Sequence, residues 1–254
     1  MQAEMNQISA LFQQGNLDAA RKLCRALVQK HPSNDKVRYA HAMICQQAGD
    51  IDAAISAYQT TVKISPSHLQ ALANLGGLLV SAGRHDEAIA PLTRALKLAP
   101  DSAPARYNLA QAYHAQGKLP AALEQAKKAR ALDDKVPDIH SFIGLVSVDM
   151  LKHAEAAEAY ERLASLVPEK RGPWIMQASN LQLCGKFEEA EDLLNAALKR
   201  YPDDPEIHNQ LSLGKRSAER EAESISVLKK KVQDMKLEEL DQVTYLFTLG
   251  DLLD

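Results

Sequence analysis

The sequence predicts an all-α protein built from stacked helical hairpins, because three kinds of residue recur with a common period of 34 residues. Five glycines are spaced by this step or by twice its length: Gly15, Gly49, Gly83, Gly117 and Gly185. Prolines keep the same step, with Asp134 in the one missing place: Pro32, Pro66, Pro100, Pro168 and Pro202. Alanines do so too: Ala20, Ala54, Ala88, Ala122, Ala156 and Ala190. A period between about 20 and 50 residues indicates a stacked-repeat architecture, in which each unit contacts only its neighbours.

Residues 69–102 illustrate one repeat. Three leucines, spaced three and four residues apart, mark one face of a first helix. Gly83 ends that helix, because a left-handed residue after a helix is usually glycine. A second helix starts near Asp86 and ends before Pro100. Each unit is therefore predicted to hold a helix A, a tight turn, a helix B and a short link.

Small residues indicate how the two helices of a hairpin pack. Gly76 on helix A and Ala88 and Ala95 on helix B lie where the helix axes are expected to approach closely. A larger side chain there would push the helices apart, and overpacking costs about 1–3 kcal/mol. A single hairpin cannot bury its apolar face alone, so at least three units must stack.

This pattern resembles the tetratricopeptide repeat (TPR) family, whose signature places Trp, Leu, Gly and Tyr on helix A and Ala and Pro on helix B. The fourth and sixth repeats show it most fully, with Leu109, Ala110, Tyr113 and Gly117, and with Trp174, Leu181, Gly185, Ala190 and Pro202. In the fifth repeat, Leu151 stands where glycine is usual. The resemblance implies a right-handed α-solenoid (an α-α superhelix) of helix-turn-helix repeats. Six repeats are predicted: 1–34, 35–68, 69–102, 103–136, 137–170 and 171–204.

The register weakens after residue 204. Residues 205–242 are predicted to form a degenerate seventh repeat, and residues 243–254 helix A of an incomplete eighth. Apolar residues crowd this end, where a polar capping face is normal: Leu246, Phe247, Leu249, Leu252 and Leu253. We expect the natural protein to continue, or a downstream domain or a second copy in a homodimer to cover this end. The segment TYLFTLGDLLD is similar to the stretch that precedes the catalytic part of bacterial TPR-sulfotransferase proteins.

The composition limits the classes of partner that this chain is expected to bind. A formal net charge of −3 gives no positive field for nucleic acid. No apolar run is long enough to span a membrane. Three cysteines without a CxxC motif favour a reducing, cytoplasmic location, with Cys24 and Cys45 predicted to be buried. The chain is thus expected to bind protein or peptide.

No catalytic pattern supports an enzyme within this chain. None of the eight histidines pairs with another at the spacing that a helical metal site uses. No GxSxG, Walker A or HExxH motif occurs. We therefore predict no catalytic residues, no metal and no cofactor, and we leave open whether the full-length protein is an enzyme.

The TPR resemblance implies that the helices A line a concave groove. The predicted peptide-binding residues are Lys36, Tyr39, Met43, Asn74, Tyr107, Asn108, Gln111, His114, Met176 and Gln182. Asn74 and Asn108 occupy the same place in adjacent repeats, and a side-chain amide offers both a donor and an acceptor to a peptide backbone. This asparagine ladder includes Asn6 and is approximated by Gln210. It is interrupted at three positions: Ala40, Phe142 and Met176.

The alternative interpretation, that asparagine is simply common at this position of the repeat, stays open. Lys36 alone does not form the basic cluster with which some relatives clamp an acidic C-terminal tail, which argues against such a ligand.

Three functions are compatible with this sequence. The leading hypothesis is a non-catalytic scaffold that receives a peptide or protein surface in the groove. The second is the N-terminal substrate-recruiting region of a larger transferase, similar to a sulfotransferase, with its catalytic domain beyond residue 254. The third is a self-association module that uses the apolar C-terminal end.

Overall fold

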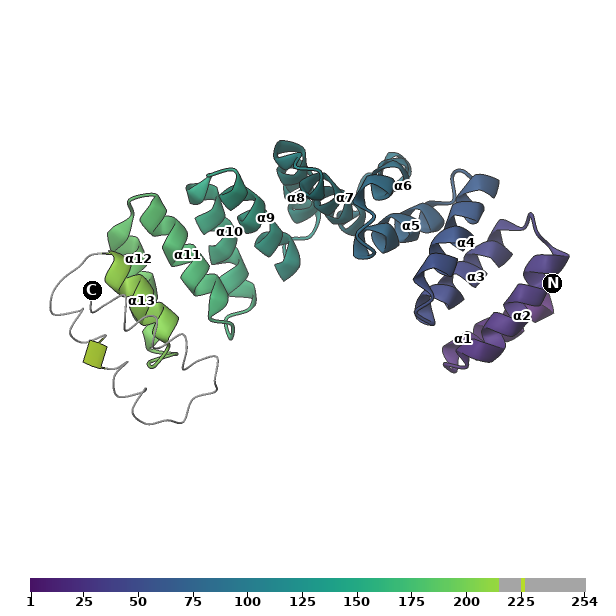
Figure 1. Cartoon of the computed structure of the whole chain (residues 1–254), viewed down its shortest axis with the longest axis horizontal. Helices are drawn as coiled ribbons and strands as arrows, with labels where there is room; N and C mark the ends of the chain where they lie inside the picture. Colours follow the sequence, from purple (N-terminus) through teal and green to yellow (C-terminus); the bar gives the residue numbers. More distant parts are fainter. Residues whose placement is uncertain (215–224, 227–254) are drawn as a thin grey trace. The chain divides into compact units, whose positions relative to one another are not determined.

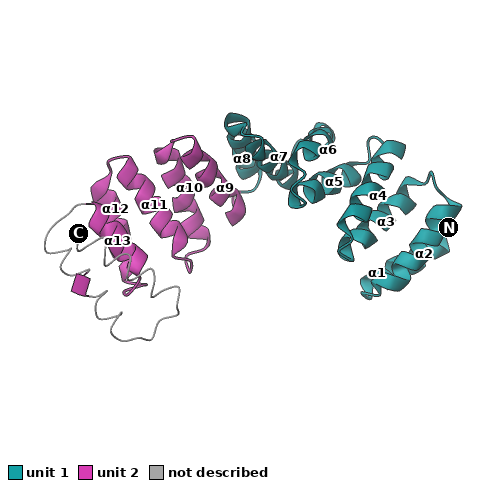
Figure 2. Cartoon of the chain, viewed as in Figure 1, with its two compact units in different colours: residues 1–133 teal, residues 134–254 magenta. Residues whose placement is uncertain are grey.

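The structure, a computed structural model, describes residues 1–214 and 225–226, and all regular secondary structure in these ranges is helical. The chain divides into two compact units, Met1–Asp133 and Asp134–Asp254 (Figure 2). The repeat pattern did not predict this division. The predicted incomplete repeat and the apolar end, with Leu246, Phe247, Leu249, Leu252 and Leu253, lie outside the described residues. So does most of the predicted seventh repeat.

The first unit consists of four consecutive helical hairpins (Figure 1). Its helices are α1 (Gln2–Gln13), α2 (Leu17–Lys30), α3 (Asp35–Gln47), α4 (Ile51–Ile64), α5 (Leu69–Ser81), α6 (His85–Leu98), α7 (Ala103–Ala115) and α8 (Leu119–Leu132). The odd-numbered helices are the helices A of their hairpins and the even-numbered ones the helices B. Helix α5 contacts α6 within its hairpin and α7 of the next one, so neighbouring helices A pack together there.

The second unit continues the same alternation. Its described helices are α9 (Pro137–Asp149), α10 (His153–Leu166), α11 (Gly172–Leu183), α12 (Phe187–Leu198) and α13 (Pro205–Gly214). Helix α11 packs against α10, α12 and α13. Each unit is thus a stack of helical hairpins, as the sequence predicts for an α-solenoid, while the repeat boundaries stay a prediction.

The periodic glycines close the hairpins, as predicted. Gly49 has φ +76°, a left-handed conformation that glycine adopts without strain. The backbone N–H of Asp50 then donates to the carbonyl of Cys45 at 2.9 Å, which satisfies an end carbonyl of α3. The Asp50 side chain in turn accepts the N–H of Ala53 at 3.2 Å and caps α4. One turn therefore ends a helix and starts the next.

Leu151 takes the same turn without being glycine. Its φ is +56°, while Lys152 N–H still donates to the Ser147 carbonyl at 2.8 Å. The Leu151 side chain is 78% exposed and contributes little packing. The surrounding helices impose the turn, and the backbone of Leu151 bears the strain.

Close approach of the two helices of a hairpin is confirmed. A Cβ at Gly76 would lie 2.4 Å from Cγ of Leu92, whose side chain is fully buried. The same relation recurs in the second unit, where a Cβ at Gly144 would lie 2.6 Å from the ring of Tyr160. Ala88 is likewise completely buried. A small residue on helix A therefore makes room for a large one on helix B.

The thiols of the first unit are structural, as predicted. Cys24 and Cys45 are completely buried, and Cys184 in the second unit is partly exposed. Burial raises the pKa of the Cys24 thiol to about 12, so the thiol stays protonated and unreactive.

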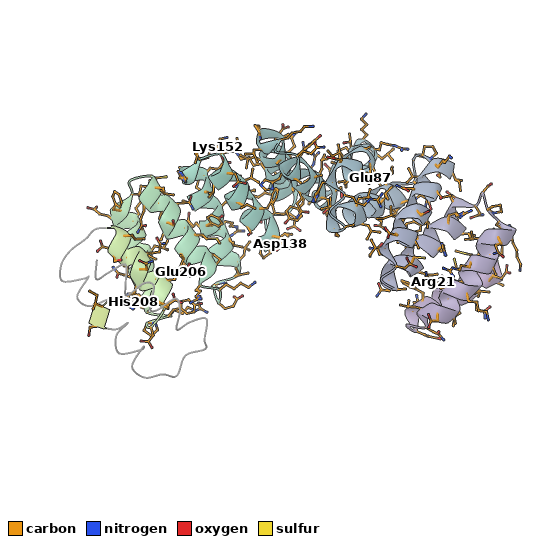
Figure 3. The ribbon with its side chains drawn as sticks, in the orientation of Figure 1. Arg21, Glu87, Asp138, Lys152, Glu206 and His208 are labelled. Atoms are coloured by element: carbon orange, nitrogen blue, oxygen red, sulfur yellow. The ribbon has the colours of Figure 1, made fainter. Side chains whose placement is uncertain are left out.

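His41 packs next to Cys45 in an environment that disfavours its charged form. Its Nε2 atom lies 3.6 Å from Sγ of Cys45. Burial is the main cause that lowers the pKa of His41 below its ordinary value of 6.5. Three guanidinium groups lower it further and outweigh the opposing effect of Asp50: Arg25, Arg21 and Arg38. Arg21, labelled in Figure 3, itself forms an ion pair with Asp50.

We expect His41 to make the first unit less stable in mild acid. The unfolded chain takes up a proton on His41 near the ordinary pKa of 6.5, whereas the folded chain does so only at lower pH. Stability is therefore lost as the pH falls from about 6.5 through the lowered folded pKa. Urea unfolding at several pH values should show this loss for the wild type and a smaller one for His41→Gln. Equal pH dependence in the two proteins would contradict the assignment.

Candidate functional site

Most predicted binding residues lie on three helices A of the first unit. Helix α3 carries Lys36, Tyr39 and Met43, helix α5 carries Asn74, and helix α7 carries Tyr107, Asn108, Gln111 and His114. Met176 and Gln182 lie on α11 of the second unit.

Asn74 and Asn108 line the same pocket, which we call the amide pocket. It has a volume of about 240 Å³ and opens between α3, α5 and α7. Its lining residues are Gln46, Ala73, Asn74, Gly77, Leu78, Ser81, Ser102, Pro104, Ala105 and Asn108. All of its side-chain polar groups are amides or hydroxyls, and no charged residue lines it. The pocket can therefore exchange hydrogen bonds with a neutral polar ligand.

A tyrosine pair holds the Asn74 side chain. Asn74 Nδ2 donates to the hydroxyls of Tyr39 and Tyr58, each at 3.2 Å. These two bonds use both donors of the amide. The Oδ1 atom of Asn74 stays available as an acceptor, since no protein donor within the described residues bonds to it. The structure thus assigns Asn74 a narrower role than a free amide that both donates and accepts.

Tyr58 extends this network to a second lining residue of the amide pocket. Its hydroxyl donates to Oε1 of Gln46 at 2.8 Å. Burial raises the Tyr58 pKa to about 12, so the hydroxyl keeps its proton at neutral pH. The rings of Tyr39 and Tyr58 lie 5.9 Å apart between centroids, and the ring of His68 lies 4.8 Å from that of Tyr39. Packing and hydrogen bonds together fix the orientation of the Asn74 amide.

Asn108 lies over a glycine of the neighbouring helix. A Cβ at Gly77 would be 2.9 Å from Asn108 Nδ2, so the absence of a side chain at Gly77 makes room for the amide. Within the described part of the chain, no protein group is hydrogen-bonded to the Asn108 side chain. Both its donor and its acceptor can therefore serve a ligand.

The other predicted residues of the first unit do not line the amide pocket. Lys36 is exposed in the first turn of α3. The side chains of Tyr107, Gln111 and His114 on α7 are half-buried. Met43 lines a different pocket, between α1 and α3.

The two predicted residues of the second unit differ in their surroundings. Met176 is 48% exposed on α11. Gln182 donates from Nε2 to the backbone carbonyl of Gln210 at 2.8 Å and so links α11 to α13. Its amide donor therefore helps to hold two helices together.

Sequence reasoning missed the contribution of Tyr58, because this residue belongs to a helix B and matches the family signature at a packing position. Only the spatial proximity of its hydroxyl to Asn74 and Gln46 gives it a role at the site. No signal in the sequence alone marks that contact.

Within the described residues, no group of three or more His, Cys, Asp and Glu side chains is placed to hold a metal ion. In the same part of the chain, no helix has the length and apolar character needed to cross a membrane.

Comparison with known proteins agrees with this architecture. Two models of the tetratricopeptide repeat family match, one over residues 1–35 and 39–103 and the other over residues 79–145 and 150–212. No curated protein matches the chain.

Solved structures with similar folds include three bacterial proteins. MamA (41-end) from Desulfovibrio magneticus RS-1 is 22% identical with a TM-score of 0.63, and the match covers 67% of this chain and 97% of that one. Pseudomonas aeruginosa pilF is 19% identical with a TM-score of 0.61, covering 81% and 94%. A tetratricopeptide repeat protein from Parabacteroides merdae ATCC 43184 is 14% identical with a TM-score of 0.62, covering 100% and 98%. The family models together match well over half of the residues, and the chain therefore belongs to the tetratricopeptide repeat family.

Proposed function

We propose that this chain is a non-catalytic scaffold that binds an extended peptide segment of a partner protein on the helix A surface of its first unit. Its family supports a protein-interaction scaffold in general. The amide pocket carries the more specific proposal, because it holds Asn74 and Asn108 side by side on adjacent helices A.

The pocket offers groups that complement a peptide backbone. A peptide N–H can donate to Oδ1 of Asn74, and the Asn108 amide can both donate to a peptide carbonyl and accept from a peptide N–H. Each such bond contributes about 0.5–1.5 kcal/mol net. Because Tyr39 and Tyr58 already fix the Asn74 amide, little side-chain entropy is lost when the ligand binds.

The absence of charge in the lining sets the ligand class. A neutral pocket does not select for acidic or basic side chains, so it favours an uncharged stretch of peptide. Lys36 alone cannot form the cluster of basic residues that would bind an acidic C-terminal tail. The net charge of −3 disfavours nucleic acid as the partner. The free thiols of Cys24, Cys45 and Cys184 are consistent with a reducing cytoplasm as the location that we propose.

The double variant Asn74→Ala/Asn108→Ala is expected to bind peptides about tenfold more weakly, because it removes two or more hydrogen bonds to the ligand backbone. The measurement is fluorescence anisotropy with a library of uncharged labelled peptides, in which the loss should be similar for every peptide bound.

Asn195→Ala is the matched control, because Asn195 is an exposed asparagine on α12 and should bind as the wild type does. Circular dichroism would verify that all variants keep their helices. Unchanged affinity of the double variant for every retained peptide would rule out the amide pocket as the binding site.

A further inference from the structure

A second pocket on the helices A of the first unit shares helix α3 with the amide pocket. It has a volume of about 170 Å³ and opens between α1 and α3. We call it the apolar pocket, after its main lining residues Ile8, Phe12, Ala40, Met43 and Ile44. Ile8 and Ile44 are only 2% and 1% exposed and form its floor.

Ala40 helps to make the lining of this pocket apolar. It stands 34 residues before Asn74 and 68 before Asn108, so it occupies the same repeat position as the two asparagines. A methyl group there replaces the polar amide of the asparagines. The interruption of the asparagine ladder at Ala40 therefore coincides with a change from a polar to an apolar pocket.

The two pockets flank the same helix. Met43 lines the apolar pocket and Gln46 lines the amide pocket, three residues or about one turn apart on α3. Packed helices lie about 8–10 Å apart. An extended chain advances about 3.3 Å per residue, so about three residues cross α3 from one pocket to the other.

The lining defines what fits. The remaining residues of the apolar pocket, Ser9 and Gln13, are uncharged, so a charged side chain would be buried there without a partner. A cavity of about 150 Å³ with an apolar lining accepts a molecule of benzene size. A pocket of about 170 Å³ therefore suits a leucine, methionine or phenylalanine side chain.

We propose that the apolar pocket receives one large uncharged apolar side chain of the same extended peptide whose backbone the amide pocket holds, about three residues away along the ligand. This inference rests on the proposed function, and it adds the sequence preference that backbone contacts alone cannot supply. The size of the pocket, its neutral lining and the helix α3 that it shares with the amide pocket support this occupant over a second copy of the chain.

The test uses a series of uncharged peptides, each with a single leucine at a different position in a serine- and threonine-rich sequence, and a control peptide without leucine. With the leucine at the best position, the wild type should bind at least about tenfold more tightly than it binds the control peptide. Ala40→Leu fills the pocket and should abolish this preference while still binding the control peptide. Met43→Ala enlarges the pocket and should weaken the preference for leucine, because a leucine side chain no longer fills it.

The Asn74→Ala/Asn108→Ala variant separates the two proposals. It should weaken leucine and control peptides equally and keep the ratio between them. A leucine preference that is absent in the wild type, or that survives in Ala40→Leu, overturns the apolar pocket while leaving the amide pocket standing. If no peptide binds the wild type, both the amide pocket and the apolar pocket are excluded as peptide-binding sites.

Discussion

Gly76→Ala is expected to lower the free energy of unfolding by about 1–2 kcal/mol. The added Cβ would lie 2.4 Å from Cγ of Leu92 and 2.5 Å from Cδ2, well inside contact distance. Leu92 is completely buried, so it cannot move away without displacing the core between α5 and α6. Such overpacking costs about 1–3 kcal/mol or more and exceeds the gain of about 1 kcal/mol from replacing a helical glycine by alanine.

Gly77→Ala is the matched control, because Gly77 is the next residue of the same helix α5 and the substitution gains the same helix propensity. Its Cβ would meet only the end of the Asn108 side chain, which can rotate away at little cost. Urea unfolding should therefore show Gly76→Ala destabilised and Gly77→Ala unchanged or stabilised by up to about 1 kcal/mol. Equal shifts in the two variants would show that the Gly76–Leu92 approach is not tight.

Leu151→Gly is expected to stabilise the second unit by about 1 kcal/mol. A left-handed conformation costs a non-glycine residue roughly 1–2 kcal/mol, and the greater freedom of glycine in the unfolded chain offsets part of that gain. Little packing is lost, because the Leu151 side chain is 78% exposed. Chemical unfolding followed by circular dichroism would measure the change.

Gly185→Leu provides the reverse experiment at the equivalent turn one repeat later. Gly185 has φ +75°, and no atom lies within 4 Å of a Cβ built there, so leucine should lower the free energy of unfolding through backbone strain alone. If Leu151→Gly destabilises the protein, the strain assigned to Leu151 is wrong.

The sequence was sufficient to predict the hairpins, because their determinants are local and repeated. A glycine at this position of the repeat, such as Gly49 or Gly83, indicates a left-handed turn. Gly76 opposite Leu92 indicates that two helices approach closely. Leu151 is an exception, because a left-handed turn forms there although the residue is not glycine. The packing of α9 against α10 holds the turn although the local signal is missing.

The candidate site was predictable only in part. The 34-residue step places Asn74 and Asn108 at equivalent positions, and the structure puts both in one pocket. The bonds from Asn74 to Tyr39 and Tyr58 could not be predicted, because they depend on the positions of side chains from three helices. Periodicity indicates which face a residue occupies, and it carries no information about the partner that the residue meets there.

Gln182 and Ala40 illustrate the same limit. The repeat position suggests a ligand contact for Gln182, yet its donor binds the Gln210 carbonyl because α13 packs against α11. In the sequence, Ala40 looks like a simple interruption of the asparagine ladder. Its significance emerges only from the apolar pocket that it lines together with Ile8, Phe12 and Met43.

The side-chain amide signals of Asn74 and Asn108 provide the most direct measurement of peptide binding at the amide pocket. In a ¹⁵N-labelled sample titrated with an uncharged peptide that binds, both signals are expected to shift with the same saturation curve, while the signal of Asn195 on α12 stays in place. Binding that saturates while the signals of Asn74 and Asn108 do not move would contradict the account.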